Sequence, residues 1–144
     1  IVNAYKEDNE IIIESFLDGT EVSVGVINYQ GEITVLPITE IVSENDFFDY
    51  EAKYLGKSQE ITPARISDEM TAKVSEVAKR VYQILKMTGF SRSEYIIVNG
   101  EPHLLEVNTI PGLTTESLIP QQAKAAGISL TDLFSNAIEL SLKK

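Results

Sequence analysis

The stretch that decides the fold is Leu104-Leu105-Glu106-Val107-Asn108-Thr109-Ile110-Pro111-Gly112-Leu113-Thr114, an apolar strand that leads into a polar turn. Because side chains alternate between the two faces of a strand, Glu106 and Asn108 share one face. Their oxygens are hard donors of the kind that suit Mg²⁺ held together with substrate phosphates. A carboxylate within a buried strand costs free energy unless a partner or a metal neutralises it. The stretch therefore predicts a metal site where a strand leaves its sheet, and the alternative is a half-exposed Glu106 on an edge strand.

A β-hairpin is expected to contain this strand. Residues 90–98 have the composition of a second strand, and Asn99-Gly100-Glu101 separates them from the first. Asn-Gly by itself favours a two-residue turn, in which Val98 pairs with Glu101. The alternative is a three-residue loop, or a bulge near Gly100, in which Val98 pairs with Pro102.

The two registers differ in where they place Glu94. In the shorter turn Glu94 lies on the face away from Glu106, whereas in the longer loop Glu94 faces Glu106 and Arg92 faces Asn108. Two opposed carboxylates repel each other unless a cation lies between them. We therefore predict the three-residue loop and a metal site. Strand parity places His103 on the face away from Glu106, as a structural residue rather than a base.

The remaining pattern predicts an α+β fold with a mainly antiparallel sheet flanked by helices. Strands are expected at residues 10–16, 21–29 and 32–42, the last interrupted by Pro37. Residues 43–65 show no sustained period. Helices are expected after the caps Ser67 and Ser129 and over residues 117–126. The stripe expected to be buried on the first helix is Met70, Val74, Val77, Val81, Ile84 and Leu85, and the apolar face of the last helix is Leu133, Phe134, Ala137, Ile138 and Leu142.

Composition is that of one globular domain. The chain has 144 residues, 43% of them hydrophobic and 24% charged, and no apolar run reaches the length of a membrane span. A net charge of −10 argues against a nucleic-acid surface, which needs clustered Lys and Arg. The absence of cysteine excludes disulfides and fits a cytoplasmic protein.

Several motifs resemble one enzyme family. They are Arg92, Glu94, Glu106 and Asn108 followed by Pro111-Gly112-Leu113-Thr114 and Glu116-Ser117-Leu118-Ile119-Pro120, together with residues 13–22 and 48–54. Over about residues 11–142 the chain resembles the C-terminal ATP-grasp half of D-alanine–D-alanine ligases. The resemblance departs from the family at Ser15, where Lys is common, and at Glu94, where Asp is usual.

The resemblance implies a role for each matching residue. Glu14 and Leu17 would contact adenine, Glu21 the ribose, and Lys53 the ATP phosphates, within a lid-like loop at about residues 44–62. Tyr54 would lie over the first D-alanine, and Ser117 and Leu118 would hold the carboxylate of the second. Arg92, Gly112 and Ser117 would serve catalysis, with Arg92 stabilising developing charge. Glu94, Glu106 and Asn108 would bind Mg²⁺ or Mn²⁺, with two ions expected.

The resemblance also implies a reaction. ATP would phosphorylate one D-alanine, and the amine of a second D-alanine would displace phosphate to form D-alanyl-D-alanine for peptidoglycan synthesis. D-lactate or another acceptor, and a non-catalytic acidic metal-binding module, remain alternatives, and a homodimer remains open for the full-length enzyme. Residues 1–144 are expected to form one domain, a C-terminal fragment without the N-terminal domain and part of the central domain. The fragment alone is therefore expected to be inactive.

Overall fold

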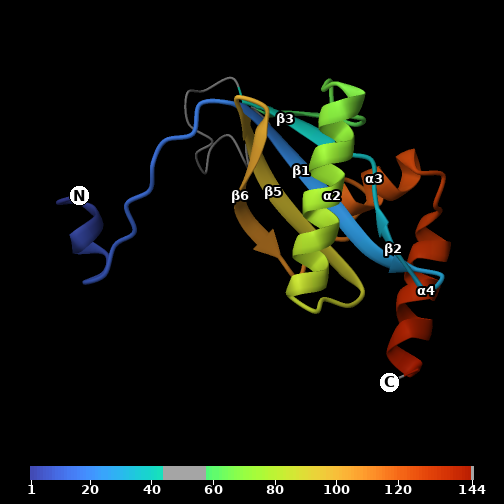
Figure 1. The fold of residues 1–144 in the computed structure, drawn as a ribbon. Coiled ribbons are helices and arrows are strands. Elements are labelled where there is room, and N and C mark those ends of the chain that lie inside the picture. The colour runs from blue at the N-terminus through green and yellow to red at the C-terminus, as the bar shows by residue number, and fades with distance from the viewer. Residues whose placement is uncertain (44–57, 144) are drawn as a thin grey trace.

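The computed structural model describes residues 1–43 and 58–143. Figure 1 shows a curved sheet with a long helix across one face and two shorter helices beyond its other face. None of the helices in these two ranges is long and apolar enough to cross a membrane. The elements in chain order are η1 (Ala4–Lys6), β1 (Thr20–Tyr29), β2 (Glu32–Val35), β3 (Thr39–Ser43), β4 (Ser58–Ile61), α2 (Asp68–Ile84), β5 (Phe90–Val98), β6 (Glu101–Asn108), α3 (Leu118–Ala125) and α4 (Leu130–Leu142).

The sheet is antiparallel at every described pairing, as the sequence predicts. Its order is β4-β3-β1-β5-β6, and β2 also pairs with β1. The strand expected at residues 32–42 is indeed interrupted at Pro37, so β2 and β3 pair with different parts of β1. Val26 pairs with Val35 and Ser23 with Thr39, which leaves a break in the ladder between these two points.

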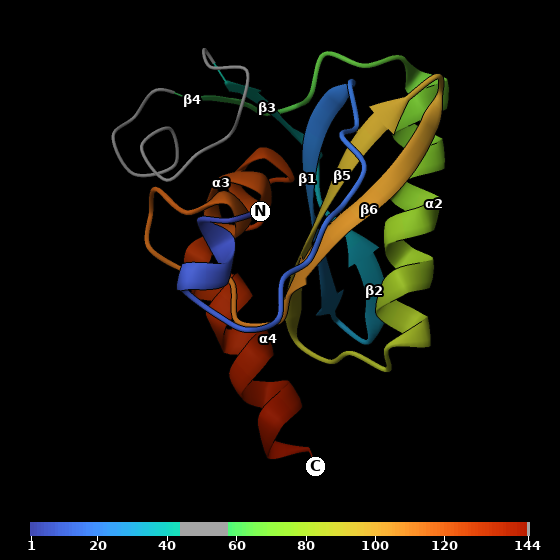
Figure 2. The same cartoon turned by 90° about the vertical axis from the view of Figure 1, so that its left-hand side faces the viewer.

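Two apolar clusters lie on opposite faces of the sheet. The first joins β1 and β5 to α2, and its buried members are Val22, Val24, Val26, Ile38, Val74, Ala78, Tyr82 and Tyr95. The second joins β1 to α3 and α4, and its buried members are Ile27, Leu36, Ile119, Ala123 and Leu133. Figure 2 shows α2 on one side of β1, β5 and β6, and α3 and α4 on the other. The alternation of β1 thus divides its side chains between two helical layers.

Helix α2 begins where the sequence predicts. The Oγ of Ser67 accepts a hydrogen bond from the backbone N–H of Met70 at 3.2 Å, which satisfies one free donor of the first turn. The expected buried stripe is partly wrong. The buried residues of α2 are Val74, Ala78 and Tyr82, whereas Ile84 and Leu85 of the expected stripe are exposed. The stripe therefore follows the small Ala78 and the amphipathic Tyr82, whose hydroxyl donates to the carbonyl of Gly89 at 3.0 Å.

Helix α4 shows a similar difference. Ser129 caps it, because its Oγ accepts from the N–H of Asp132 at 3.1 Å. Leu133 is fully buried against β1 and α3, but Ile138 and Leu142 of the same predicted face are exposed. Only the first half of this apolar face therefore packs onto the described sheet.

The strand expected at residues 10–16 is wrong. Residues 10–18 have no regular secondary structure, and Ile12 is 86% exposed. In Figure 1 this segment leads away from the sheet toward the N-terminus. Apolar alternation indicates a face that can be buried, but a strand also needs a neighbouring strand to accept its ladder hydrogen bonds.

Candidate active site

The β5–β6 hairpin brings together the predicted metal-binding residues by an unexpected route. Val98 pairs with Glu101, so the turn is the two-residue Asn99-Gly100 turn and the expected three-residue loop is wrong. Asn99 and Gly100 both have positive φ, 51° and 79°, as a type I′ hairpin turn requires. Yet Glu94 pairs with Glu106, because the register shifts between Glu94 and Tyr95.

The shift is a β-bulge with Leu105 as the extra residue. Tyr95 pairs with Leu104 and Glu94 with Glu106, so Leu105 has no cross-strand counterpart. Because of this extra residue, each residue between the bulge and the turn lies on the opposite face from the one that strict alternation from Glu106 would give it. His103 pairs with Ile96 and therefore lies on the same face as Glu106, contrary to the prediction from strand parity.

One face of the sheet carries the predicted metal ligands together with Arg92 and Glu21. Arg92 pairs with Asn108 across the hairpin, two residues along from the pair of glutamates. On the other side of β5, Gly25 pairs with Arg92 and Ser23 with Glu94, so Glu21 follows on the same face of β1. This is the face opposite α2, which lies toward α3 and α4 (Figure 2).

Arg92 forms an ion pair within its own strand. One terminal nitrogen of its guanidinium lies 2.8 Å from Oε1 of Glu94, and the two side chains are only 13% and 14% exposed. The Nε of Arg92 is buried and has no hydrogen-bond partner among the described residues. A buried donor of this kind is costly unless an acceptor is supplied. The guanidinium can therefore receive an anionic group on this face in addition to Glu94.

The two other metal-ligand candidates differ in their surroundings. Oδ1 of Asn108 accepts a hydrogen bond from the N–H of Ile110 at 3.0 Å, which fixes the start of the turn after β6. Glu106 is exposed on the same face. Within residues 1–43 and 58–143 no group of three or more His, Cys, Asp or Glu side chains forms a metal cluster. Two carboxylates and one carboxamide nevertheless give the all-oxygen donor set that Mg²⁺ or Mn²⁺ accepts when phosphates complete the shell.

The turn that leads to α3 is built around Gly112 and Ser117. Ser117 is the N-cap residue of α3, but its side chain does not cap the helix. Its Oγ accepts from the N–H of Thr114 at 3.2 Å and lies 2.9 Å from the Thr114 hydroxyl. A Cβ on Gly112 would lie 2.7 Å from this Oγ, so a side chain at residue 112 would displace the Ser117 hydroxyl. The first N–H groups of α3 consequently remain available to an anion.

Other predicted site residues are not brought to this face. Glu14 and Leu17 lie in the irregular segment before β1, and Glu14 is exposed. A Cβ on Gly19 would lie 2.2 Å from the carbonyl oxygen of Ile97, which shows how closely this segment reaches the end of β5. Lys53 and Tyr54 lie outside the described residues.

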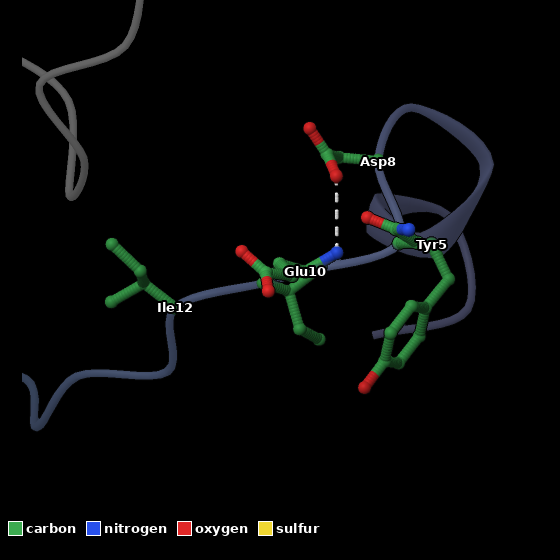
Figure 3. A pocket seen from close by; sticks show the side chains of 6 residues that line it. Tyr5, Asp8, Glu10 and Ile12 are labelled. Carbon is green, nitrogen blue, oxygen red and sulfur yellow. Dashed lines mark hydrogen bonds between the residues drawn. The ribbon is translucent and has the colours of Figure 1, made fainter.

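Neither of two hollows among the described residues is lined by Arg92, Glu94, Glu106 or Asn108. One is formed entirely by residues 5–12, where Oδ1 of Asp8 accepts from the N–H of Glu10 at 3.1 Å (Figure 3). It contains none of the predicted site residues. The other, of about 280 Å³, lies between the start of β5, α4 and the turn after β6, and Phe90, Ile110 and Leu140 contribute to its apolar lining.

Comparison with known proteins finds one family of ligases. The family profile described as "D-ala D-ala ligase C-terminus" matches residues 1–139. The D-alanine–D-alanine ligase of Flavobacterium johnsoniae is 86% identical over 139 residues, which are 96% of this chain and 43% of that protein.

Solved structures show the same fold. A Bacillus anthracis D-alanine–D-alanine ligase complexed with ATP is 28% identical at a TM-score of 0.73, over 90% of this chain and 40% of that one. The VanG D-Ala:D-Ser ligase of Enterococcus faecalis is 34% identical at a TM-score of 0.72, over 87% and 37%. The expected ATP-grasp architecture is thereby confirmed, and the chain spans less than half the length of these relatives. The chain belongs to the D-alanine–D-alanine ligase family, of which it matches the C-terminal part.

Proposed function

We propose that this chain forms one wall of the active site of an ATP-dependent D-alanine–D-alanine ligase. The observation that carries the proposal is the single face on which Arg92, Glu94, Glu106 and Asn108 meet, in a member of this family. The reaction would convert two D-alanines and ATP to D-alanyl-D-alanine, ADP and phosphate. An acyl phosphate on the first D-alanine would be the intermediate that the second amine attacks.

Metal binding is proposed for the two opposed glutamates and Asn108. Mg²⁺ or Mn²⁺, with two ions expected, would offset the charge of the ATP phosphates. Glu94 contacts Arg92 at 2.8 Å, so its carboxylate would also hold the guanidinium close to the proposed metal ligands. Glu94 is one methylene longer than the usual Asp, and its carboxylate remains an oxygen ligand of the kind that Mg²⁺ accepts.

The protein residues would act by position and charge. Arg92 would donate to the oxygens that gain charge as the phosphoryl and acyl groups transfer. The start of α3 at Ser117 and Leu118 would hold the carboxylate of the acceptor D-alanine at the positive end of the helix, with the N–H of Leu118 as a donor because that of Ser117 already donates to the carbonyl of Thr114. Gly112 would allow the turn to approach the reacting phosphate.

Nucleotide binding is proposed for the other residues implied by the family resemblance. Glu14 and Leu17 would contact adenine, Glu21 the ribose, and Lys53 the phosphates, while Tyr54 would help to cover the first D-alanine. Glu21 has support in its position on the same face as Glu94. The family's ATP complex from Bacillus anthracis supports ATP as the nucleotide.

The cellular setting follows from the proposed substrates. The dipeptide would serve peptidoglycan synthesis and so cell shape, and the reaction would take place in the cytoplasm, where ATP is available. A homodimer is proposed as one form of the complete enzyme, and its mass in solution would decide between dimer and monomer.

A different acceptor is the main alternative. The similarity to a D-Ala:D-Ser ligase at 34% identity shows that this fold accommodates acceptors other than D-alanine. D-serine and D-lactate share the carboxylate that the start of α3 would bind, so the described residues alone favour none of them. A non-catalytic metal-binding module would need neither Glu21 nor a nucleotide.

The test uses a hybrid ligase, in which this chain replaces the matching part of the Flavobacterium johnsoniae enzyme. We expect the hybrid to form D-alanyl-D-alanine, with one ADP and one phosphate for each dipeptide. Parallel reactions with D-serine or D-lactate as the acceptor compare the alternatives. A folded hybrid that binds ATP but forms no dipeptide would overturn the proposal.

The chain by itself should give no dipeptide under the same conditions, because positioning both halves of the nucleotide underlies phosphoryl transfer. Turnover by the isolated chain that disappears in Arg92→Ala would contradict this expectation. A Mg²⁺-dependent thermal shift with an ATP analogue distinguishes the ligase from the metal-binding module.

A further inference from the structure

Gln122 is a fully buried polar residue that the family motifs do not include. It lies on α3, one turn after Leu118, and its side-chain amide makes three hydrogen bonds. Oε1 accepts from the N–H of Gly25 at 2.9 Å, while Nε2 donates to the carbonyl of Ser23 at 3.0 Å and to Oγ1 of Thr39 at 2.9 Å. Both N–H groups and the oxygen of this amide thus form hydrogen bonds within the protein, although the side chain lies in an apolar layer.

The amide fills a gap in the sheet. Strand β1 pairs with β3 up to Ser23 and with β2 from Val26 onward, and Pro37 separates the two. The carbonyl of Gly25 still accepts from the N–H of Leu36 at 2.8 Å, but its N–H faces no backbone carbonyl. Gln122 therefore takes over the hydrogen bonds that a continuous strand would have supplied.

Gly25 allows α3 to come close enough for this contact. A Cβ at this position would lie 2.4 Å from Oε1 of Gln122 and 2.6 Å from Cδ1 of Ile119. Both distances are far shorter than a real Cβ contact allows, so a side chain at residue 25 would displace the amide of Gln122 and the end of the Ile119 side chain. The contact between α3 and this part of β1 thus depends on one glycine and one glutamine.

The same positions on β1 are paired with the candidate catalytic strand. Ser23 is opposite Glu94, and Gly25 is opposite Arg92. The single amide of Gln122 therefore links the helix that begins at Ser117 and Leu118 to the part of β1 that holds Arg92 and Glu94 in register. In the proposed reaction these are the acceptor-binding end and the phosphate-binding end of one site.

We propose that Gln122 is a positioning residue for the acceptor amino acid, which holds the start of α3 at a fixed distance from Arg92. This inference rests on the proposed ligase function. Loss of the amide would let α3 shift, so the acceptor carboxylate would bind less well, while the ATP-binding residues on β1, β5 and β6 would keep their places.

If Gln122 only stabilised the fold, its loss would not affect D-alanine binding selectively. Asn136 provides a matched control. Asn136 on α4 also uses both ends of a side-chain amide to hold a helix to β1 and the turn after it. Its Nδ2 donates to the carbonyl of Asn28 at 2.6 Å, and its Oδ1 accepts from the N–H of Gln30 at 2.9 Å. Helix α4 carries none of the proposed site residues, so losing this tie should destabilise the fold without moving the acceptor site.

The experiment measures the half-saturating concentrations of D-alanine and of ATP, and kcat, in the hybrid ligase. Gln122→Met keeps the side-chain volume and removes the hydrogen bonds. We expect it to raise the half-saturating D-alanine concentration roughly tenfold and to change that for ATP less than about twofold. Gly25→Ala retains the glutamine but puts a methyl group where its Oε1 lies, so the amide must leave its hydrogen bonds to β1 and the variant should give the same pattern. Asn136→Leu should leave both concentrations unchanged.

The outcomes separate the two claims. An unmodified hybrid that forms no dipeptide overturns the proposed function, and the role of Gln122 with it. If the unmodified hybrid is active, equal effects of Gln122→Met on D-alanine and ATP, or the same D-alanine effect in Asn136→Leu, would overturn the positioning role alone. Should Gln122→Met fail to fold, Gly25→Ala decides, because a normal half-saturating D-alanine concentration in that variant contradicts the inference.

Discussion

Glu94 and Glu106 lie directly opposite each other on β5 and β6, although a two-residue turn closes the hairpin between them. A regular ladder from that turn would have placed the two carboxylates on opposite faces. The extra residue Leu105 shifts the register by one residue, so that Glu106 instead of Leu105 pairs with Glu94. Such β-bulges are common near functional sites. The face proposed to bind metal thus depends on the bulge, which accommodates the extra residue without changing this pairing.

Deletion of single residues from β6 tests this dependence. Without Leu105 the ladder becomes regular, and Glu94 still pairs with Glu106, so the hybrid ligase should keep its Mg²⁺-dependent ATP binding within a few-fold. Without Val107, Asn108 falls opposite Ser93 and moves to the face of α2, so this binding should be lost. Calorimetric titration with an ATP analogue measures both. Equal binding by the two deletion variants would show that the register does not matter.

The planar guanidinium group of Arg92 should be needed for turnover. Arg92→Lys keeps the charge but loses the planar donors, and we expect kcat of the hybrid ligase to fall roughly a hundredfold or more. Arg80→Lys, on the exposed face of α2, is the control and should have normal kcat. A near-normal kcat in Arg92→Lys would show that a positive charge alone is sufficient at this position.

Two leucines of α4 should differ in their contribution to stability. Leu133 is fully buried, whereas Leu142 is 81% exposed. Leu133→Ala should lower the free energy of unfolding by about 3 kcal/mol, because it leaves a cavity between α4 and β1. Leu142→Ala should change it by less than about 0.5 kcal/mol. Urea unfolding of the purified chain compares the two, and similar losses would mean that the second half of α4 is also covered.

Glu40 should make stability depend on acid pH. Arg65 donates to its carboxylate from Nε at 2.8 Å, from a terminal guanidinium nitrogen at 2.8 Å and from its backbone N–H at 3.1 Å. These hydrogen bonds hold the pKa of Glu40 below its ordinary value of 4.5, and they outweigh the opposing effect of burial. Because the folded-state pKa lies below that of the unfolded chain, the stabilisation is present above about pH 4.5 and is lost as the pH falls through the folded-state pKa.

Glu40→Gln is the corresponding variant. Its free energy of unfolding should be lower than that of the unmodified chain at pH 7, and the difference should shrink as the pH approaches about 3. Unfolding curves at several pH values measure this difference. A difference that stays constant over this range would mean that the charge of Glu40 contributes nothing.

The antiparallel sheet, the helix starts and the family motif could be predicted from the sequence, because each depends on local signals. Ser67 and Ser129 cap helices where expected, and Pro37 interrupts its strand. Tertiary contacts determine the other features, such as which helix residues are buried and whether residues 10–18 form a strand. Tyr82 is buried because its hydroxyl reaches Gly89, and the apolar residues Ile12 and Ile13 remain exposed because residues 10–18 do not form a strand.

The site shows the same division. The pairing of Glu94 with Glu106 was predicted correctly but for the wrong reason, since Asn99-Gly100 forms the short turn that its composition favours. No sequence signal marks Leu105 as the bulged residue, and His103 changed face with it. Gln122 could have been suspected only as a polar residue within an apolar helical face, because its partners at Ser23 and Gly25 are almost a hundred residues away.

The most direct test of the central claim is the binding of Mn²⁺ with a non-hydrolysable ATP analogue to the hybrid ligase, measured by electron paramagnetic resonance. Glu106→Gln should weaken Mn²⁺ binding tenfold or more, by rough analogy with other losses around metal ligands. Glu101→Gln, on the same strand but paired with Lys73 at 2.6 Å, should bind Mn²⁺ as the unmodified hybrid does. Equal Mn²⁺ affinity in Glu106→Gln and the unmodified hybrid would contradict a metal–nucleotide site on the β5–β6 face.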